Sequence, residues 1–235
     1  MGPLDRLARS ASEFAVFMGP QAREPTNDAG PPSAAVNLYW IPLGAGAHVV
    51  RLSGRLYEAI SARVQRRRSC NLYHSALEVV VPEGRFVIEM TPIPDVHGHQ
   101  RGVVLEGSVG TRLAGRFRLF RYEIRRWRDG IIPDMAEAVW SPTIVADDLS
   151  RALRILDLVP SLPALVWGRD ERHTGEMWNS NSVNSWLLAR AGIHAEGIQL
   201  PPRGRAPGWR AGLVIAARDA APAGSSVEAG DGISD

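Results

Sequence analysis

The sequence predicts an α+β domain whose sheet is mostly antiparallel. Short runs of alternating apolar and polar residues are separated by Gly, Pro and other turn formers, as in strands and hairpins. Other segments carry apolar residues three or four positions apart, as in helices. The predicted elements follow one another as strands, a helix, strands, two helices and a last strand. This order is typical of an α+β domain.

The clearest strands are residues 72–81 and 85–91, which are rich in Val, Ile and Leu. Pro82-Glu83-Gly84 lies between them and predicts a hairpin turn. The same reasoning predicts the remaining strands at 37–42, 48–52, 102–109, 117–127 and 209–217.

Three helices are expected. The first spans about 54–67 and ends in an arginine run that suits the negative end of the helix dipole. The second spans 147–158, where Leu149, Leu153 and Leu156 form one stripe. The third follows residue 179. Residues 133–138 suggest only a short helical turn.

The composition of both ends differs from that of the middle. Residues 1–35 include a Pro-, Gly- and Asn-rich stretch that is typical of a linker, so we expect a flexible N-terminal segment. Residues 219–235 are small and polar, as in disordered tails. A single domain of about 36–218 is therefore predicted.

The overall charge excludes no partner class, but it favours neither nucleic acid nor another polyanion. The formal net charge is only +2, and all 27 basic residues are arginines. The run 117–127 mixes arginines with aromatics and could contact a nucleic acid strand. Strand alternation accounts for the run equally well, so we expect no nucleic-acid partner.

The sequence also bears on the cellular compartment. Its longest apolar runs are far shorter than the ~20 residues that a membrane span requires, and its first residues do not resemble a signal peptide. The single cysteine, Cys70, excludes an internal disulfide. We therefore expect a cytoplasmic protein without a membrane span.

The loop Asp95–His99 contains a carboxylate and two alternating imidazoles, which could bind zinc. No nearby cysteine or histidine completes the set of ligands, and an incomplete set is a weak signal. We expect a polar surface loop here, with neither a metal nor a cofactor.

The most informative stretch is 177–188, which begins polar and ends apolar. Four successive residues from Asn179 to Ser182 could cap a helix, and Gly192 suits its C-terminal end. A hydroxyl at Ser180 or Ser182 would lie near the positive end of this helix, where a nucleophile or an anion is stabilised. A capping cluster before a core helix explains the same residues, so both interpretations stay open.

The segment 73–79, with His74 near its start, and the hairpin strand 85–90 resemble the histidine strand of permuted papain-like proteins. These include the NlpC/P60-related permuted group, the lecithin retinol acyltransferase-like proteins and the PPPDE-type peptidases. In that superfamily the nucleophile begins a later helix, and residues 179–183 are similar to that motif. The complete chain also resembles a family of actinobacterial-type proteins. That second resemblance does not indicate which reaction, if any, the chain catalyses.

The resemblance implies a papain-like fold in which Ser180 takes the position of the nucleophilic cysteine and His74 acts as the base. A hydroxyl in that position requires general-base assistance and an oxyanion hole. Cys70 cannot replace Ser180, because it precedes His74 by only four residues and no helix begins at that position. Glu89 and Thr91 on the partner strand are the candidates that would orient His74. If Glu83-Gly84 forms a two-residue turn, Glu89 lies opposite Glu78 and Thr91 opposite Ala76, all on the face of His74.

Two functions are compatible with these residues. The first is a hydrolase or acyltransferase that acts on an amide or ester through Ser180 and His74, on a small-molecule or peptide substrate. The second is a catalytically inactive papain-like binding module. In both, the residues expected to contact the ligand are Asn179, Asn181, Ser182 and Trp178.

Overall fold

A computed structural model describes residues 34–43, 70–93, 102–132 and 134–221, which all belong to one unit, Ser33–Asp235. The predicted strand 48–52, the helix 54–67 and the loop Asp95–His99 lie outside the described residues. The described elements are, in chain order, β1 Ala35–Pro42, β2 Asn71–Val81, β3 Gly84–Pro92, β4 Val103–Ser108, η1 Ala114–Arg116, η2 Arg118–Phe120, β5 Arg121–Arg128, η3 Met135–Glu137, β6 Val139–Ala146, α2 Leu149–Leu158, η4 Val159–Ser161, α3 Ser180–Arg190, η5 Ala195–Gly197, β7 Gly204–Arg205 and α4 Trp209–Ala220.

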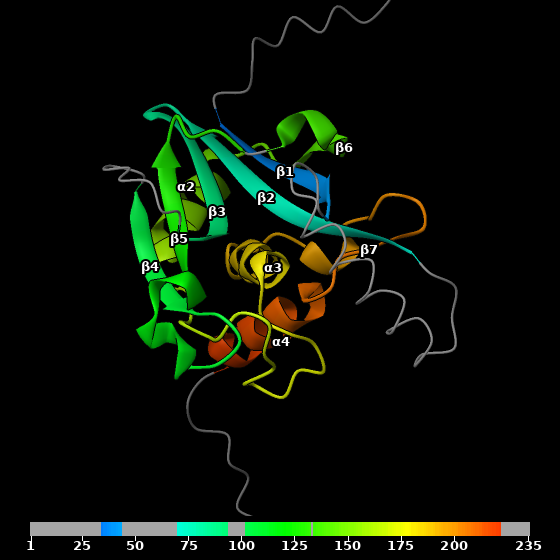
Figure 1. Ribbon diagram of the computed structural model, residues 1–235. Coiled ribbons are helices and arrows are strands. Elements are labelled where there is room, and N and C mark those ends of the chain that lie inside the picture. Colours follow the sequence, from blue (N-terminus) through cyan, green and yellow to red (C-terminus); the bar gives the residue numbers. More distant parts are fainter. Residues whose placement is uncertain (1–33, 44–69, 94–101, 133, 222–235) are drawn as a thin grey trace, which may run out of the picture. The chain divides into compact units, whose positions relative to one another are not determined.

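Among the described residues the sheet contains seven strands, and its main path has the order β4-β5-β3-β2-β1-β6 (Figure 1). Every neighbouring pair along this path is antiparallel, while the two-residue β7 pairs in parallel with the start of β2. The described part of the chain also contains three α-helices. The predicted α+β class with a mostly antiparallel sheet is therefore confirmed.

The two faces of the sheet bury different sets of residues, because side chains alternate along each strand. Strand β2 directs Tyr73, Leu77 and Val79 into the main core, together with Leu38 and Trp40 of β1. The opposite face carries a smaller apolar cluster, formed by Tyr39, Ile41, Ala76, Val87 and Ile132. Helices α2, α3 and α4 contribute to the main core only.

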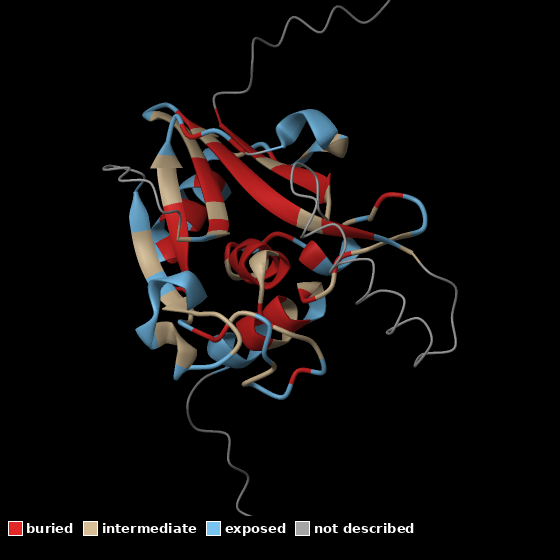
Figure 2. Ribbon diagram, viewed as in Figure 1, coloured by how far each residue is buried: buried red, intermediate tan, exposed pale blue. Residues whose placement is uncertain are grey.

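Helix α3 lies between the sheet and α4, so that all of its residues from Asn181 to Leu188 are buried (Figure 2). The helix α4 can approach closely because it has a glycine at the contact. A Cβ atom added to Gly212 would lie 2.1 Å from the carbonyl oxygen of Ser182. The helix ends as predicted, since Gly192 adopts φ +78° and its N–H donates to the Ala189 carbonyl.

The β2–β3 hairpin exists, but its predicted register is wrong by two residues. Val81 pairs with Gly84, so Pro82 and Glu83 form the turn, not Glu83 and Gly84. Glu78 therefore faces Val87, and Glu89 pairs with Arg125 on its other side. A shift of two residues leaves every side chain on the face that was predicted for it.

Two predicted strands differ from the structure. In the first, residues 117–120 form 3-10 turns, because the N–H groups of Phe117 and Phe120 donate to the carbonyl groups three positions earlier, and β5 begins only at Arg121. In the second, 209–217 belong to the helix α4. Its buried residues follow helical spacing and are Ala211, Gly212, Ile215 and Ala216.

The structure also corrects the buried face of α2 and adds the edge strand β6. Leu149 and Leu153 remain 40% and 38% exposed, whereas Ala152 and Ile155 are fully buried. In β6, the β-branched run Thr143-Ile144-Val145 is a typical strand signal that sequence reasoning did not use. Ordered elements reach slightly beyond 36–218, since β1 begins at Ala35 and α4 ends at Ala220.

Candidate functional site

The N-terminus of α3 is closed by a capping box, in which the cap and the third helical residue bond each other's backbone. The Asn179 side-chain oxygen accepts from the N–H groups of Asn181 and Ser182 at 2.9 and 3.3 Å. The Ser182 hydroxyl accepts from the Asn179 N–H at 3.1 Å. These bonds satisfy N–H groups that would otherwise be unpaired at the helix start. The positive end of the helix is therefore already partly occupied by the chain itself.

Asn181 uses its whole side chain to attach α3 to the rest of the core. Its amide oxygen accepts from the Ser75 hydroxyl at 2.9 Å. Its amide nitrogen donates to the carbonyl oxygens of Tyr73 and Pro207, at 3.0 and 2.9 Å. Because the residue is only 2% exposed and both donor hydrogens are used, Asn181 holds the fold together and offers nothing to a ligand.

The next polar residues of α3 extend this buried network. The Ser182 hydroxyl oxygen lies 2.8 Å from the Gly208 carbonyl oxygen, and the Ser185 hydroxyl donates to the Trp209 carbonyl at 2.7 Å. The Asn184 amide donates to the Ser75 hydroxyl at 2.9 Å. The polar stretch thus joins α3 to β2 and to residues 207–209, as expected for buried polar groups that must be hydrogen-bonded.

The remaining predicted ligand contact, Trp178, is also interior. It is 1% exposed and forms a parallel bridge with Trp167. The Asn179 amide nitrogen likewise donates a hydrogen bond to the Pro207 carbonyl, at 2.8 Å. The structure therefore gathers Trp178, Asn179, Asn181 and Ser182 at one place, but it uses all four for packing and hydrogen bonding inside the domain.

The structure does not bring Ser180 and His74 together. Ser75, the neighbour of His74 in β2, points toward α3 and bonds Asn181. The alternation of side chains then directs His74 to the other face of the sheet, where it pairs with Ile41 of the smaller cluster. The sheet separates the imidazole from the Ser180 hydroxyl, so the predicted nucleophile–base pair lacks its geometry.

Ser180 and His74 also differ in environment from a catalytic pair. The Ser180 hydroxyl is half-buried and makes no hydrogen bond with any described residue. Burial lowers the pKa of His74 to about 4, although the charge of the nearby Asp134 acts in the opposite direction. A base whose pKa lies so far below neutrality removes protons poorly at pH 7.

Glu89 lies on the same face of the sheet as His74, the face with the smaller apolar cluster, and it takes part in a group of charged side chains there. Its carboxylate lies 3.7 Å from the Arg125 guanidinium, which also bonds Glu123. Both Arg125 and Glu123 are nearly buried, at 5% and 6% exposed. The expected opposition of Glu89 to Glu78 does not occur. Glu78 instead accepts hydrogen bonds from Asn37, Tyr39 and Arg85.

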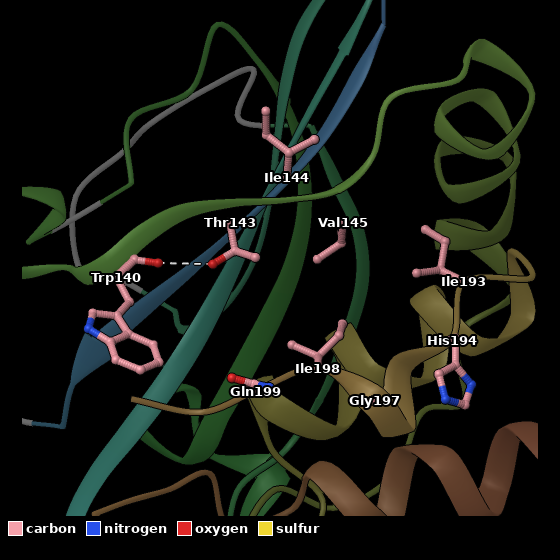
Figure 3. Close-up of a pocket in the computed structure, with 9 residues that line it drawn as sticks. All are labelled: Trp140, Thr143, Ile144, Val145, Ile193, His194, Gly197, Ile198 and Gln199. Carbon is pink, nitrogen blue, oxygen red and sulfur yellow. Dashed lines mark hydrogen bonds between the residues drawn. The ribbon is translucent and has the colours of Figure 1, made fainter. Parts of the chain in front are cut away.

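A separate groove lies between the edge strand β6 and the segment around η5 (Figure 3). Its volume is about 480 Å³, within the range of ligand sites. Val145, Ile193 and Ile198 supply apolar walls, and the large side chains of Trp140 and Ile144 remain 56% and 58% exposed beside it. The sequence prediction missed this groove because it did not identify β6.

The described residues contain no group of three potential metal ligands, and the loop Asp95–His99 is not among them. Each helix in the described ranges is too short or too polar to cross a membrane. Comparisons of the chain with family models, with curated proteins and with solved structures found no match.

Proposed function

We propose that this domain is a binding module without hydrolytic chemistry, and that it binds an extended peptide through an apolar side chain in the groove beside β6. The observation that carries the proposal is the groove itself, an apolar hollow of about 480 Å³ along an edge strand. It agrees with the second function expected from the sequence in having no catalysis, but it places the ligand beside β6 and not at residues 178–182.

Acyl transfer lacks support because a general base must lie within hydrogen-bond reach of the nucleophile, directly or through one water. The sheet lies between His74 and Ser180. The papain-like resemblance stays a prediction about the fold. The order of histidine strand, hairpin and later helix is present, whereas the imidazole faces away from that helix.

An extended peptide fits this site better than a compact ligand because of the strand that borders it. β6 is the last strand of the sheet and pairs only with β1 among the described strands. Its outer edge therefore has backbone groups that an added strand can bond. Pro142 has no N–H, which limits such pairing to the part from Thr143 to Ala146.

The side chains at the groove favour a protein ligand as well. Trp140 and Ile144 are large apolar residues that are more than half exposed on a strand. Aromatic residues are enriched in protein interfaces, and an apolar pocket gives specificity for one side chain of a strand-like peptide. We therefore expect the bound peptide to insert one aliphatic or aromatic side chain between Val145 and Ile198.

The test is a selection of random peptides on the full chain, followed by measurement of Kd for the enriched sequences. Peptides with a shared apolar position should be enriched, and Trp140→Ala and Ile144→Asp should each weaken their binding at least about tenfold. Both residues are exposed, so the variants should stay folded. Ile131→Asp, at a residue that is 69% exposed on another segment, is the matched control and should bind normally.

Two results would overturn the proposal. One is a selection that enriches no common sequence on the folded protein. The other is a set of peptides that bind Trp140→Ala and Ile144→Asp as tightly as they bind the wild type. A third result would support the enzyme hypothesis instead: hydrolysis of an amide or ester by the wild type that both Ser180→Ala and His74→Ala abolish.

A further inference from the structure

The connection between β4 and β5 exposes an unusual set of side chains. Residues 111–121, here called the basic–apolar loop, include η1 and η2 and carry four large apolar residues on the surface. Leu119 is 83% exposed, Leu113 72%, Phe117 66% and Phe120 44%. Figure 2 shows these turns, below β4 and β5, largely in the colour of exposed residues. Exposed apolar side chains gathered in this way mark an interaction surface.

The charge of the same loop has one sign. Between Glu106 and Glu123 the sequence contains four arginines and no acidic residue. Arg121 and Arg112 form ion pairs with Glu106 and Glu171 outside the loop. Arg116 is exposed and forms no ion pair with any described residue. The loop therefore presents cationic groups next to apolar ones, which suits an anionic partner with an apolar interior.

The loop also has a defined shape, so it presents these side chains together. The Phe117 and Phe120 N–H groups donate at 2.9 Å to the carbonyl groups of Ala114 and Phe117, and the Val109 N–H donates to the Phe120 carbonyl at 2.8 Å. The neighbouring segment adds a further arginine, because Arg169 donates to the Gly110 carbonyl. Four apolar side chains and several guanidinium groups thus project from one short, hydrogen-bonded connection.

We propose that the basic–apolar loop docks on an anionic membrane surface, with Leu113, Phe117 and Leu119 entering the lipid interface and the arginines contacting the headgroups. A peripheral protein binds such a surface through apolar insertion combined with attraction to anionic lipid. This inference is independent of the peptide groove at β6, which involves other residues.

A membrane is favoured over nucleic acid by the kind of apolar side chain. Aromatic rings stack on bases, and a single-strand binding surface relies on them. The two most exposed residues of the loop are leucines, which gain nothing from stacking but transfer favourably into the acyl region. The aliphatic half of the loop would have no role on a nucleic acid.

The experiment is co-sedimentation of the full chain with phosphatidylcholine vesicles, with and without phosphatidylserine. The wild type should bind the vesicles that contain phosphatidylserine and should bind neutral vesicles at least about tenfold more weakly. Phe117→Ser combined with Leu119→Ser should reduce binding at least tenfold, and so should Arg116→Glu. Thermal melts check folding, which these exposed positions should leave unchanged.

Matched controls come from exposed residues elsewhere on the described chain. Ile131→Ser replaces a residue that is 69% exposed, and Arg203→Glu reverses an exposed charge beside β7. Both should bind vesicles as the wild type does. Binding that the loop variants and the control variants lose equally would overturn the proposal, because general charge or hydrophobicity would then account for it.

Three further outcomes would also overturn it. One is the absence of binding to vesicles with phosphatidylserine. Another is tight binding of a single-stranded oligonucleotide that the loop variants abolish while vesicle binding is unchanged, which would assign the surface to nucleic acid. The third is a wild-type dimer that Phe117→Ser with Leu119→Ser converts to a monomer without changing vesicle binding, which would assign it to a second copy of the chain.

Discussion

Ser75 and Asn181 are 106 positions apart in the chain, and the Ser75 hydroxyl donates a 2.9 Å hydrogen bond to the Asn181 amide oxygen. Each residue follows directly after one member of the predicted catalytic pair, His74 and Ser180. The prediction therefore identified the two elements that meet, β2 and α3, but not the two side chains. Adjacent residues of a strand face opposite sides of the sheet, so Ser75 faces α3 while His74 faces away from it. A structural hydrogen bond therefore takes the place of the predicted catalytic pair.

Asn181→Ala should destabilise the protein by roughly 2–4 kcal/mol, because it removes the side-chain donor to the buried Tyr73 carbonyl and the acceptor of the buried Ser75 hydroxyl. The Pro207 carbonyl loses only one of its two donors, since Asn179 still bonds it. The free energy of unfolding from urea denaturation measures this effect. Ser180→Ala, at the neighbouring half-buried position, is the control and should cost less than about 1 kcal/mol. Equal costs for the two variants would contradict the structural role of Asn181.

Trp186→Ala should cost roughly 3–5 kcal/mol, because the side chain is 2% exposed in the main core. Part of this cost belongs to the indole N–H, which donates to the Asp219 carboxylate at 3.0 Å. Trp186→Phe keeps most of the apolar volume and should lose less. A cost below about 1 kcal/mol for the alanine variant, again from urea denaturation, would show that the residue is not in the core.

Gly212→Ala should also be strongly destabilising, although the substitution adds only one methyl group. That methyl would lie 2.1 Å from both the Ser182 carbonyl oxygen and the Ser185 hydroxyl, so α4 would have to move away from α3. We expect a loss of about 1–3 kcal/mol, visible as a lower melting temperature. Gly192→Ala is a poor control because its φ is +78°. Ala217→Ser, at an exposed position of α4, is the better control and should cost about 0.5 kcal/mol or less.

Ser180→Cys, in a background with Cys70→Ala, tests whether His74 acts on this position. A helix N-terminus alone can lower the pKa of a thiol below its free value of about 8.5. Since the sheet separates the two residues, adding His74→Ala should change the rate of alkylation at mildly acidic pH by less than about twofold. A rate that falls many-fold on removal of His74 would establish contact between them and revive the acyl-transfer hypothesis.

His74 should make the protein less stable as the pH falls below neutrality. Its pKa is about 4 in the folded protein and 6.5 ordinarily, so between these values protons bind the unfolded chain preferentially. The free energy of unfolding should decrease by up to ~3 kcal/mol over this interval and show no contribution of His74 above pH 6.5. Urea denaturation at several pH values measures the slope.

His74→Gln should remove this part of the pH dependence, so that the variant and the wild type diverge between pH 6.5 and pH 4. His194→Gln, at an exposed histidine, provides the comparison and should follow the wild type. If His74→Gln shows the same decline as the wild type, His74 titrates normally in the folded protein and is not enclosed as described.

Local signals in the sequence correctly indicated several elements. The β-branched runs and the turn at Pro82-Glu83-Gly84 identified β2 and β3, and the consecutive caps from Asn179 with Gly192 identified the start and the end of α3. These features depend on residues that are close in the chain, where backbone preferences and capping bonds act. The wrong predictions, by contrast, concern segments whose local sequence is compatible with two structures. Residues 209–217 contain a Leu-Val-Ile run that favours a strand, but in the structure they form α4, which packs on α3.

The α+β class, the hairpin after β2 and the capped helix α3 follow from the sequence, because each depends on periodicity and on local hydrogen bonding. The role of the polar residues at the helix start depends on tertiary packing instead. Asn181, Ser182 and Ser185 find their partners in β2 and in residues 207–209, far away in the chain. Whether a capping hydroxyl faces a base or a buried carbonyl group depends on which sheet face the helix covers, and long-range packing of the apolar core makes that choice.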